Sequence, residues 1–350
     1  MLGYVEIICL VKLSKYLERF IMIWSRIRYI RHKLYGLVFI ESPSTSISLP
    51  SGVHRRWGFY KTSPPSCNTG QCMCQFSVSV TATLVDSFAQ LPYCVGITKV
   101  EDKIYFLHQV PNFIKVYEGL NGFRLVTDIG LSRAERVFDI VYSNETKFVY
   151  ISDPHGNCMW VMTTTGENQP TRCLMSVRET NAFSLSNEGH LLMLKGESFS
   201  QLEIYSLNAS LIRTLQLPPE IKNPRHVVQT STGNFIISHR LNNASSGPFV
   251  ISKFTPDGKL THRFIPGTQS TELNNPTHLS LDSENNRLFV ADNFNHRVIL
   301  FDSTALTWRQ VILSQEINGL RYPFRLLYDA RRKHLFVSQY NYNVNVYELN

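Results

Sequence analysis

Residues capable of chemistry recur at one position in a series of similar segments. The segments align on Pro92, Arg136 or Val137, Pro224, Pro276 and Pro323. About two residues further on stand Cys94, Asp139, His226, His278 and Arg325, and the remaining segment has Ala182 or Phe183 there. If equivalent strands surround one channel, two histidines, a carboxylate and a thiol would face one another in it. Such a set could hold a divalent metal ion.

A structural role for these residues is the interpretation that we favour. Polar side chains inside a channel commonly bond to one another and to water. The sequence contains no G-x-S-x-G, H-E-x-x-H, P-loop or G-x-G-x-x-G motif. We therefore expect a protein that is not an enzyme, with no catalytic residue, no metal and no cofactor. The alternative is a metal-dependent lyase or hydrolase that uses the channel.

The elements that would position these side chains form a repeat. Short strands recur about every 45 residues, centred on Tyr105, Tyr150, Leu192, Ile236, Phe289 and Phe336. The longest interval contains a polar insertion, residues 242–247, which can form a loop. Six strand-rich units of this length predict an all-β fold, a six-bladed β-propeller.

The two ends of the chain are predicted to close the ring. The sixth unit stops after its third strand, residues 344–349, and this strand would be left with an unpaired edge. The alternating segment 75–86 precedes the first unit and can supply the missing outer strand. The predicted propeller therefore spans residues 74–350.

The residues before the propeller have a different composition. Residues 1–41 predict a basic amphipathic helical extension, because Lys12, Lys15, Arg19, Arg26 and Lys33 fall on one side of a helical wheel. Residues 10–33 could therefore rest on a membrane surface, although an extension without a specific task is the interpretation that we favour. Residues 42–73, rich in Ser, Pro, Gly and Cys, predict a linker. Charges interrupt the apolar residues of the extension, so we expect no secretion signal and a cytoplasmic protein.

Basic residues are concentrated at the start of the chain. The formal net charge is +8, but residues 1–65 hold ten Lys and Arg against three Glu. The rest of the chain has 25 basic and 24 acidic side chains, which excludes a bulk nucleic-acid-binding domain. Within it, residues 222–350 have 14 basic and 9 acidic side chains. An acidic partner should prefer that half.

Three cysteines cluster ahead of the propeller. Cys67, Cys72 and Cys74 could bind a metal or form a disulfide, but they lack the paired spacing of structural zinc sites. We favour unpaired thiols in a loop.

One unit resembles an NHL repeat. The matching residues are Asn275-Pro276, the apolar pair Leu279 and Leu281, and residues 291–298, ADNFNHRV. Asn223-Pro224 and Tyr322-Pro323 are weaker matches to the Asn275-Pro276 part of this repeat. The resemblance is to the propellers of tripartite-motif proteins, which bind proteins and RNA hairpins. No RING or B-box segment precedes the propeller, so in a ubiquitin-ligase pathway the chain could act only as a substrate-recognition partner.

A second resemblance concerns the channel. Peptide-amidating lyase is an NHL-type propeller whose metal sits on channel histidines. This chain offers only His226 and His278 at such positions, which weakens the comparison.

These considerations predict a binding surface on one face of the disc. Its candidate ligand-binding residues are Arg225, His226, His278, Arg321 and Arg325. A protein is the favoured partner, and RNA is the second candidate because RNA binding requires several phosphate contacts. His296 and Arg297 are predicted to fix a loop or to bond across blades, and Asp153 and Asp292 to cap turns.

Overall fold

The computed structural model describes most of the residues that follow residue 78. The described ranges are 79–89, 93–119, 122–164, 172–177, 180–195, 200–241, 247–267, 271–340 and 343–350. The chain divides into two units, Met1–Phe76 and Ser77–Asn350. In the first, strand β1 (Ile40–Glu41) pairs antiparallel with β2 (Trp57–Gly58). The rest of the predicted helical extension and linker, including Cys67, Cys72 and Cys74, lies outside the described residues.

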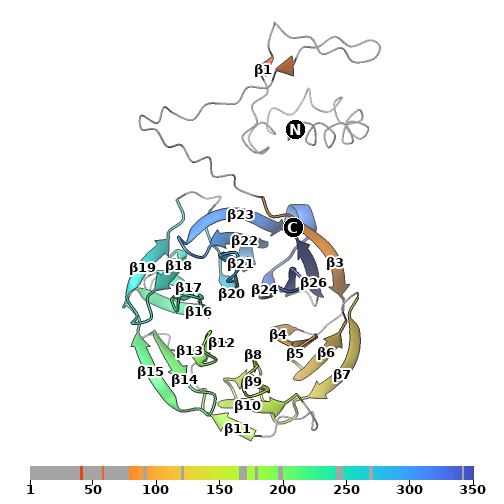
Figure 1. Ribbon diagram of the computed structural model, residues 1–350, viewed down its shortest axis with the longest axis vertical. Helices are drawn as coiled ribbons and strands as arrows, with labels where there is room; N and C mark the ends of the chain where they lie inside the picture. Colours follow the sequence, from red (N-terminus) through yellow and green to blue (C-terminus); the bar gives the residue numbers. More distant parts are fainter. Residues whose placement is uncertain are drawn as a thin grey trace. The chain divides into compact units, whose positions relative to one another are not determined.

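The second unit is a ring of six four-stranded antiparallel sheets (Figure 1). Blade 1 contains β4 (Cys94–Val100), β5 (Lys103–His108), β6 (Phe113–Glu118) and β7 (Arg124–Gly130). Blade 2 contains β8 (Asp139–Ser143), β9 (Phe148–Asp153), β10 (Cys158–Thr163) and β11 (Arg172–Met175). Blade 3 contains β12 (Thr180–Leu185), β13 (Leu191–Lys195), β14 (Gln201–Tyr205) and β15 (Leu211–Gln216).

The second half of the ring repeats this order. Blade 4 contains β16 (Ile221–Gln229), β17 (Phe235–Leu241), β18 (Phe249–Phe254) and β19 (Leu260–Phe264). Blade 5 contains β20 (Pro276–Asp282), β21 (Arg287–Asp292), β22 (Arg297–Asp302) and β23 (Thr307–Ser314). Blade 6 contains β24 (Pro323–Asp329), β25 (His334–Gln339), β26 (Asn343–Leu349) and β3 (Ala82–Phe88). The predicted six-bladed β-propeller is confirmed.

The strand sequences account for their places within a blade. The second strands are almost continuously apolar because both of their faces are covered by neighbouring blades, and Phe289, Phe336 and Tyr150 are fully buried on them. The outer strands expose about half of their side chains, as in β15, where Leu211 and Ile212 are more than half exposed. Each buried large apolar side chain contributes about 1.5–3 kcal/mol. The core therefore lies between blades.

The two chain ends pair in blade 6, as predicted. Strand β3 runs antiparallel to β26, with Val344 opposite Phe88 and Leu349 opposite Ala82 (Figure 1). The backbones of Thr81 and Asn350 exchange two hydrogen bonds of 3.0 Å. Strand β3 begins at Ala82, directly after the residue that bonds to Asn350. Residues 75–78 of the predicted outer strand lie outside the described residues.

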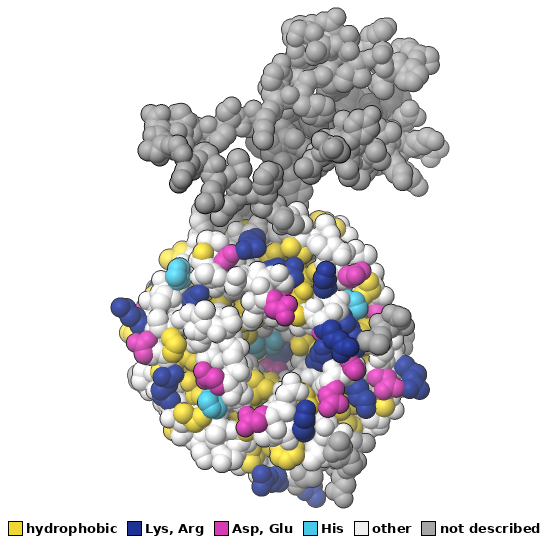
Figure 2. Space-filling model, viewed as in Figure 1, with side chains coloured by type: hydrophobic (Ala, Val, Ile, Leu, Met, Phe, Trp, Pro, Cys, Tyr) yellow, Lys and Arg dark blue, Asp and Glu magenta, His cyan; other side chains and the backbone are white. Residues whose placement is uncertain are grey.

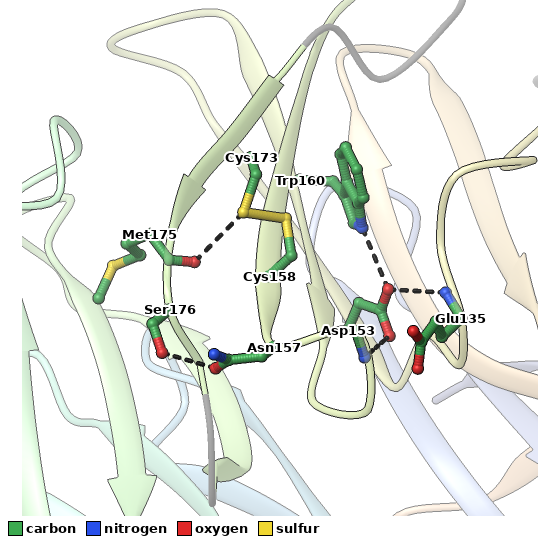
Figure 3. The surroundings of a disulfide bond; sticks show 9 residues. Glu135, Asp153, Asn157, Cys158, Trp160, Cys173, Met175 and Ser176 are labelled. Atoms are coloured by element: carbon green, nitrogen blue, oxygen red, sulfur yellow. Dashed lines mark hydrogen bonds between the residues drawn. A yellow bond between two sulfur atoms is a disulfide. The ribbon is translucent and has the colours of Figure 1, made fainter.

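A disulfide joins the two outer strands of blade 2 (Figure 3). Cys158 on β10 and Cys173 on β11 have Cα atoms 5.5 Å apart. The sequence analysis did not pair them, because only the ladder between β10 and β11 brings the two residues together. Cys94 is buried and free, and burial raises the pKa of its thiol to about 12.

Among the described residues, no helix has the length and apolar character that crossing a membrane would require.

Candidate functional site

Irregular inner strands set which residues face the channel. In five of the six blades a register shift near the start of the inner strand re-aims the following side chain. After the shift, His226 pairs with Ser238, His278 with Ala291 and Arg325 with Ser338. Asp139 begins β8 in the same place, opposite Ser152. The predicted channel positions of these four residues therefore agree with the observed register.

In blade 1 the equivalent residue is Gly96, so the prediction for Cys94 was wrong. Gly96 pairs with Leu107, whereas Cys94 precedes the register shift and pairs with His108. The Cys94 thiol donates to the Gly96 carbonyl at 3.5 Å and packs in an apolar cluster with Phe88 and Phe106. A Cβ atom at Gly96 would lie 2.7 Å from Ile140 Cγ2, so this place accepts no side chain. In blade 3, Ala182 occupies the position, opposite Leu194.

Three channel residues form a compact buried cluster. One ligand-type atom each from Asp139, His226 and His278 lies within 4.8 Å of the others, and the two imidazole rings are 3.7 Å apart. Burial lowers the pKa of both histidines well below 6.5, and the Arg325 charge adds to this effect. Burial raises the pKa of Asp139 to about 6, against the opposing effect of Arg325. Both imidazoles are therefore neutral at pH 7.

The hydrogen bonds of the two histidines favour a structural role over metal binding. The backbone N–H of Leu279 donates to His226 Nδ1, and that of Leu326 donates to His278 Nδ1, each at 3.3 Å. A neutral imidazole that accepts at Nδ1 carries its proton on Nε2. The Nε2 atoms therefore have no lone pair for a metal unless the rings lose that proton. The bonds instead tie blade 4 to blade 5 and blade 5 to blade 6.

Arg325 crosses the channel wall from blade 6 to blade 2. Its side chain is 2% exposed and donates to the carbonyls of Val95 and Phe138, the latter at 3.0 Å. The guanidinium carbon also lies 4.8 Å from the Phe138 ring centre and 4.5 Å from that of Phe324. Hydrogen bonds and ring faces thus hold this buried charge, and no acidic residue of the described part of the chain forms an ion pair with it.

A cavity of about 310 Å³ opens where the inner strands begin, and we call it the channel mouth. Its lining includes three arginines, Arg136, Arg225 and Arg325, from blades 2, 4 and 6, together with His155 and the aromatic residues Tyr93, Phe138 and Phe324. Its lining contains no Asp or Glu. Figure 2 shows that the disc is hollow at its centre, whereas basic and acidic side chains are interspersed over the face in view. The channel mouth therefore concentrates positive charge.

An aromatic ridge extends from the channel mouth over blades 1, 6 and 5. It consists of Phe324, Tyr93, Tyr340, Tyr322 and Phe294, whose successive ring centres are 5.4, 4.8, 6.4 and 6.3 Å apart. Tyr340 is 57% exposed, Phe294 54% and Tyr322 41%. All five lie at the beginnings of inner strands or in loops at that end of the blades. They make a continuous apolar surface on the face that carries the channel mouth.

The five predicted ligand-binding residues do not form one patch. Arg225 and Arg325 line the channel mouth, and Arg321 is exposed on the same face outside it. His226 and His278 are only 3% and 9% exposed, because their strand positions turn them into the channel. Their expected place in a surface patch was wrong.

The loop roles that the sequence predicted are confirmed. His296 Nδ1 accepts the backbone N–H of Tyr322 across blades 5 and 6, and Arg297 pairs with Asp292 at 2.7 Å. Asp292 also accepts the N–H of the loop before its own blade. Asp153 does the same in blade 2 and accepts the Trp160 indole (Figure 3).

The aromatic ridge was not predicted from the sequence, although one residue of an unusual type marks it. Asn223, Asn275 and Tyr322 each precede the proline of an inner strand and have φ angles of 46°, 57° and 46°. Asparagine tolerates this left-handed conformation, whereas tyrosine adopts it with strain of order 1 kcal/mol. The tyrosine in place of asparagine marks blade 6 as different from its neighbours.

Comparisons with known proteins support the fold alone. The chain matches no known protein family and no curated protein sequence. It is similar to a solved structure of hydrazine synthase from Kuenenia stuttgartiensis, with a TM-score of 0.57, 14% identity and coverage of 72% of this chain and 82% of that one. A protein of unknown function from Bacteroides thetaiotaomicron gives a TM-score of 0.56 at 14% identity, covering 78% and 76%.

A third solved structure is itself a propeller by name. The Cps50 (Swd1) β-propeller domain from Myceliophteria thermophila gives a TM-score of 0.54 at 10% identity, covering 77% of this chain and 100% of that domain. The structural likeness supports the β-propeller fold, and at identities this low it supports the fold alone. It does not confirm the resemblance to NHL repeats.

Proposed function

We propose that this protein is a non-enzymatic scaffold that binds a protein partner on the face bearing the aromatic ridge. The carrying observation is the continuity of the ridge, whose Tyr340, Phe294 and Tyr322 expose two-fifths or more of their surface. Tyrosine and phenylalanine are enriched in the buried centres of protein interfaces. A propeller presents such groups on a rigid disc, where partner binding costs little ordering of the backbone.

Backbone strain at Tyr322 supports this proposal. Its N–H donates to His296 and its carbonyl accepts the Tyr340 N–H, so two bonds hold the left-handed conformation in place. Strain maintained by surrounding bonds is typical of functional positions. An asparagine would fit this backbone better, but it would remove an aromatic ring from the exposed surface.

Site-specific cross-linking tests the proposed face. A photo-reactive benzoylphenylalanine replaces Tyr340 in one protein and Ile212 in another, and both proteins are irradiated in extract from the source cells. Ile212 is a matched control because it is 51% exposed on the outer strand of blade 3. We expect a discrete protein adduct from position 340 that Phe294→Ala weakens. The same adduct at equal yield from position 212 would contradict the proposal.

The runner-up function is a metal-dependent lyase or hydrolase using Asp139, His226 and His278. Their mutual proximity favours it, and the two backbone N–H groups that donate to the Nδ1 atoms oppose it. Elemental analysis of purified protein beside His226→Ala and His278→Ala decides between them. A stoichiometric metal that both substitutions remove would establish the metal site.

Three further assignments belong to this proposal. A role as a substrate-recognition partner in ubiquitin-ligase pathways rests on the NHL resemblance, and surface contact with a membrane rests on residues 10–33, outside the described residues. The proposed compartment is the cytoplasm; the Cys158–Cys173 disulfide opposes this proposal, because structural disulfides are rare there. The test is to alkylate free thiols while the cells are being lysed. Alkylated Cys158 and Cys173 would support that compartment, and an intact disulfide would overturn it.

A further inference from the structure

We infer that the channel mouth is a carboxylate-binding pocket that receives an acidic residue of the partner. This inference rests on the proposed function and names the chemistry of the partner segment. The acidic residue would enter the cavity, while its apolar neighbours would pack on the aromatic ridge. Tyr93 and Phe324 belong to both the cavity lining and the ridge, so the two surfaces are continuous.

The positive charges of the channel mouth have no acidic partners in the described structure. Arg136, Arg225 and Arg325 converge on the cavity from three blades, and none of them forms an ion pair with a described residue. Arginines elsewhere in the described blades commonly do have such partners, for example Arg263 with Glu220 and Arg287 with Asp282. Arg325 lowers the pKa of buried Asp139 through its charge, but the two side chains form no ion pair. The channel mouth therefore has a surplus of cations.

Arg225 has a buried hydrogen-bond donor that the described structure leaves without an acceptor. This side chain is half-buried, and its Nε atom is buried with no hydrogen-bond partner in the described part of the chain. Burial and the nearby charge of Arg240 lower its pKa. A buried donor without a partner is costly, and a carboxylate accepts from a guanidinium in bidentate geometry. An incoming carboxylate would supply the acceptor that Arg225 lacks.

The shape and lining of the channel mouth favour an acidic peptide over RNA. The cavity has apolar walls formed by Tyr93, Phe138 and Phe324, which suit a carboxylate on a short hydrocarbon stem. RNA binding depends on many phosphate contacts spread along a basic surface. Exposed Glu135 is the neighbour of Arg136 in the sequence, so the basic surface does not continue outward from the cavity as RNA binding would require. The geometry therefore favours one or two inserted carboxylates.

Fluorescence anisotropy with the full chain tests this inference. The probe is a fluorescein-labelled, C-terminally amidated hexaglutamate peptide, which carries carboxylates only on side chains. We expect saturable binding that weakens at least tenfold in Arg225→Gln. Arg225→Lys keeps a charge and should lose less. Arg213→Gln is the control, because Arg213 is exposed on the outer strand β15, and it should bind as the wild type does.

Two more probes identify the source of the carboxylate. A fluorescein-labelled pentaalanine with a free C-terminus carries only a chain-end carboxylate, and tighter binding of this probe would assign the pocket to a C-terminus. Binding of a ten-nucleotide oligouridine that depends on Arg225, without hexaglutamate binding, would overturn the inference in favour of RNA. Equal hexaglutamate affinity in Arg225→Gln and Arg213→Gln would also overturn it.

Thermal melting of each variant guards against misfolding, since a variant that melts as the wild type does reports on binding alone. The cross-linking result separates this inference from the proposed function. If position 340 still gives its adduct but hexaglutamate does not bind, the carboxylate assignment fails while the binding face stands. If the adduct is also absent, the proposed function fails with it.

Discussion

The inner channel and the channel mouth differ in whether the fold supplies hydrogen-bond partners for their side chains. In the channel, His226 and His278 are almost fully buried, and each accepts a backbone N–H from the next blade. At the mouth, Arg225 has a buried Nε without a partner in the described structure, and on the adjoining aromatic ridge Tyr340 is 57% exposed. The two channel histidines thus join neighbouring blades, whereas Arg225 and the exposed aromatic residues are available to a ligand.

Stability and binding therefore depend on different residues, although the two sets lie close together along the axis of the disc. A polar residue type at a repeated position does not identify a site, because repetition also places polar residues where blades must be joined. What identifies a site is a group whose hydrogen-bonding capacity or apolar surface the fold leaves unused. Variants in the two regions should therefore fail in different ways.

The largest effect should come from opening the ring, on which both regions depend. Deletion of residues 1–88 removes β3 and exposes the edge of β26, where Val344 and Val346 are fully buried. We expect aggregation or a large fall in melting temperature, because an unpaired apolar edge strand invites association. Deletion of residues 1–65 should leave melting nearly unchanged. A soluble 89–350 protein that melts as the wild type does would show that this closure is dispensable.

Arg325 should show the next largest effect, since it belongs to both regions. Arg325→Met leaves the Val95 and Phe138 carbonyls without this donor and removes a positive charge that lowers the pKa of Asp139. We expect a loss of about 3–5 kcal/mol in unfolding free energy. Denaturant unfolding measures it. A loss below 1 kcal/mol would mean that Arg325 is not part of the structural ring.

Asp139 gives a pH-dependent test of the channel. Its folded pKa of about 6 lies above the ordinary value of 3.8, so between these pH values the native state binds more protons than the unfolded state. The contribution of Asp139 to stability therefore falls as pH rises from about 4 to 6. Asp139→Asn should be more stable than the wild type at pH 7.5, by up to about 3 kcal/mol.

This advantage of Asp139→Asn should shrink towards zero as pH falls from 6 to 4. The depressed pKa values of His226 and His278 act in the opposite direction in both proteins, because they lower stability as pH falls below 6.5. The comparison of the two proteins at each pH cancels that effect. A difference that does not vary with pH would show that Asp139 ionises normally.

The repeat made much of the fold predictable from sequence. Six units of similar length and one incomplete final unit were enough to predict the ring and its closure by the chain ends. The channel positions of Asp139, His226, His278 and Arg325 followed from the same alignment. The error at Cys94 arose because Pro92 is not equivalent to the other prolines. Cys94 itself holds the place of Pro276 and Pro323, before the register shift, and Gly96 follows the shift as His278 and Arg325 do.

The candidate site was much less predictable. Tyr93 and Tyr340 come from opposite ends of the propeller sequence and meet only because the ring closes between blades 1 and 6. Whether Arg225 is satisfied depends on partners contributed by other blades. Contacts of this kind arise from the closed ring, so periodicity within one unit cannot reveal them.

The smallest effect on stability, and the sharpest separation of the two regions, should come from Tyr322→Asn. Asparagine occupies the same left-handed position in blades 4 and 5, at Asn223 and Asn275. Relief of strain should offset the lost ring contacts, leaving stability within about 1 kcal/mol of the wild type. The ridge, however, would be interrupted between Tyr340 and Phe294.

The most direct measurement is therefore the yield of the adduct cross-linked from position 340, compared with and without Tyr322→Asn at matched thermal stability. If the aromatic ridge is the binding surface, the yield should fall about tenfold while the melting temperature stays nearly constant, as expected when a central interface anchor is removed. An unchanged yield in a protein that melts like the wild type would contradict the assignment of this face as the binding surface.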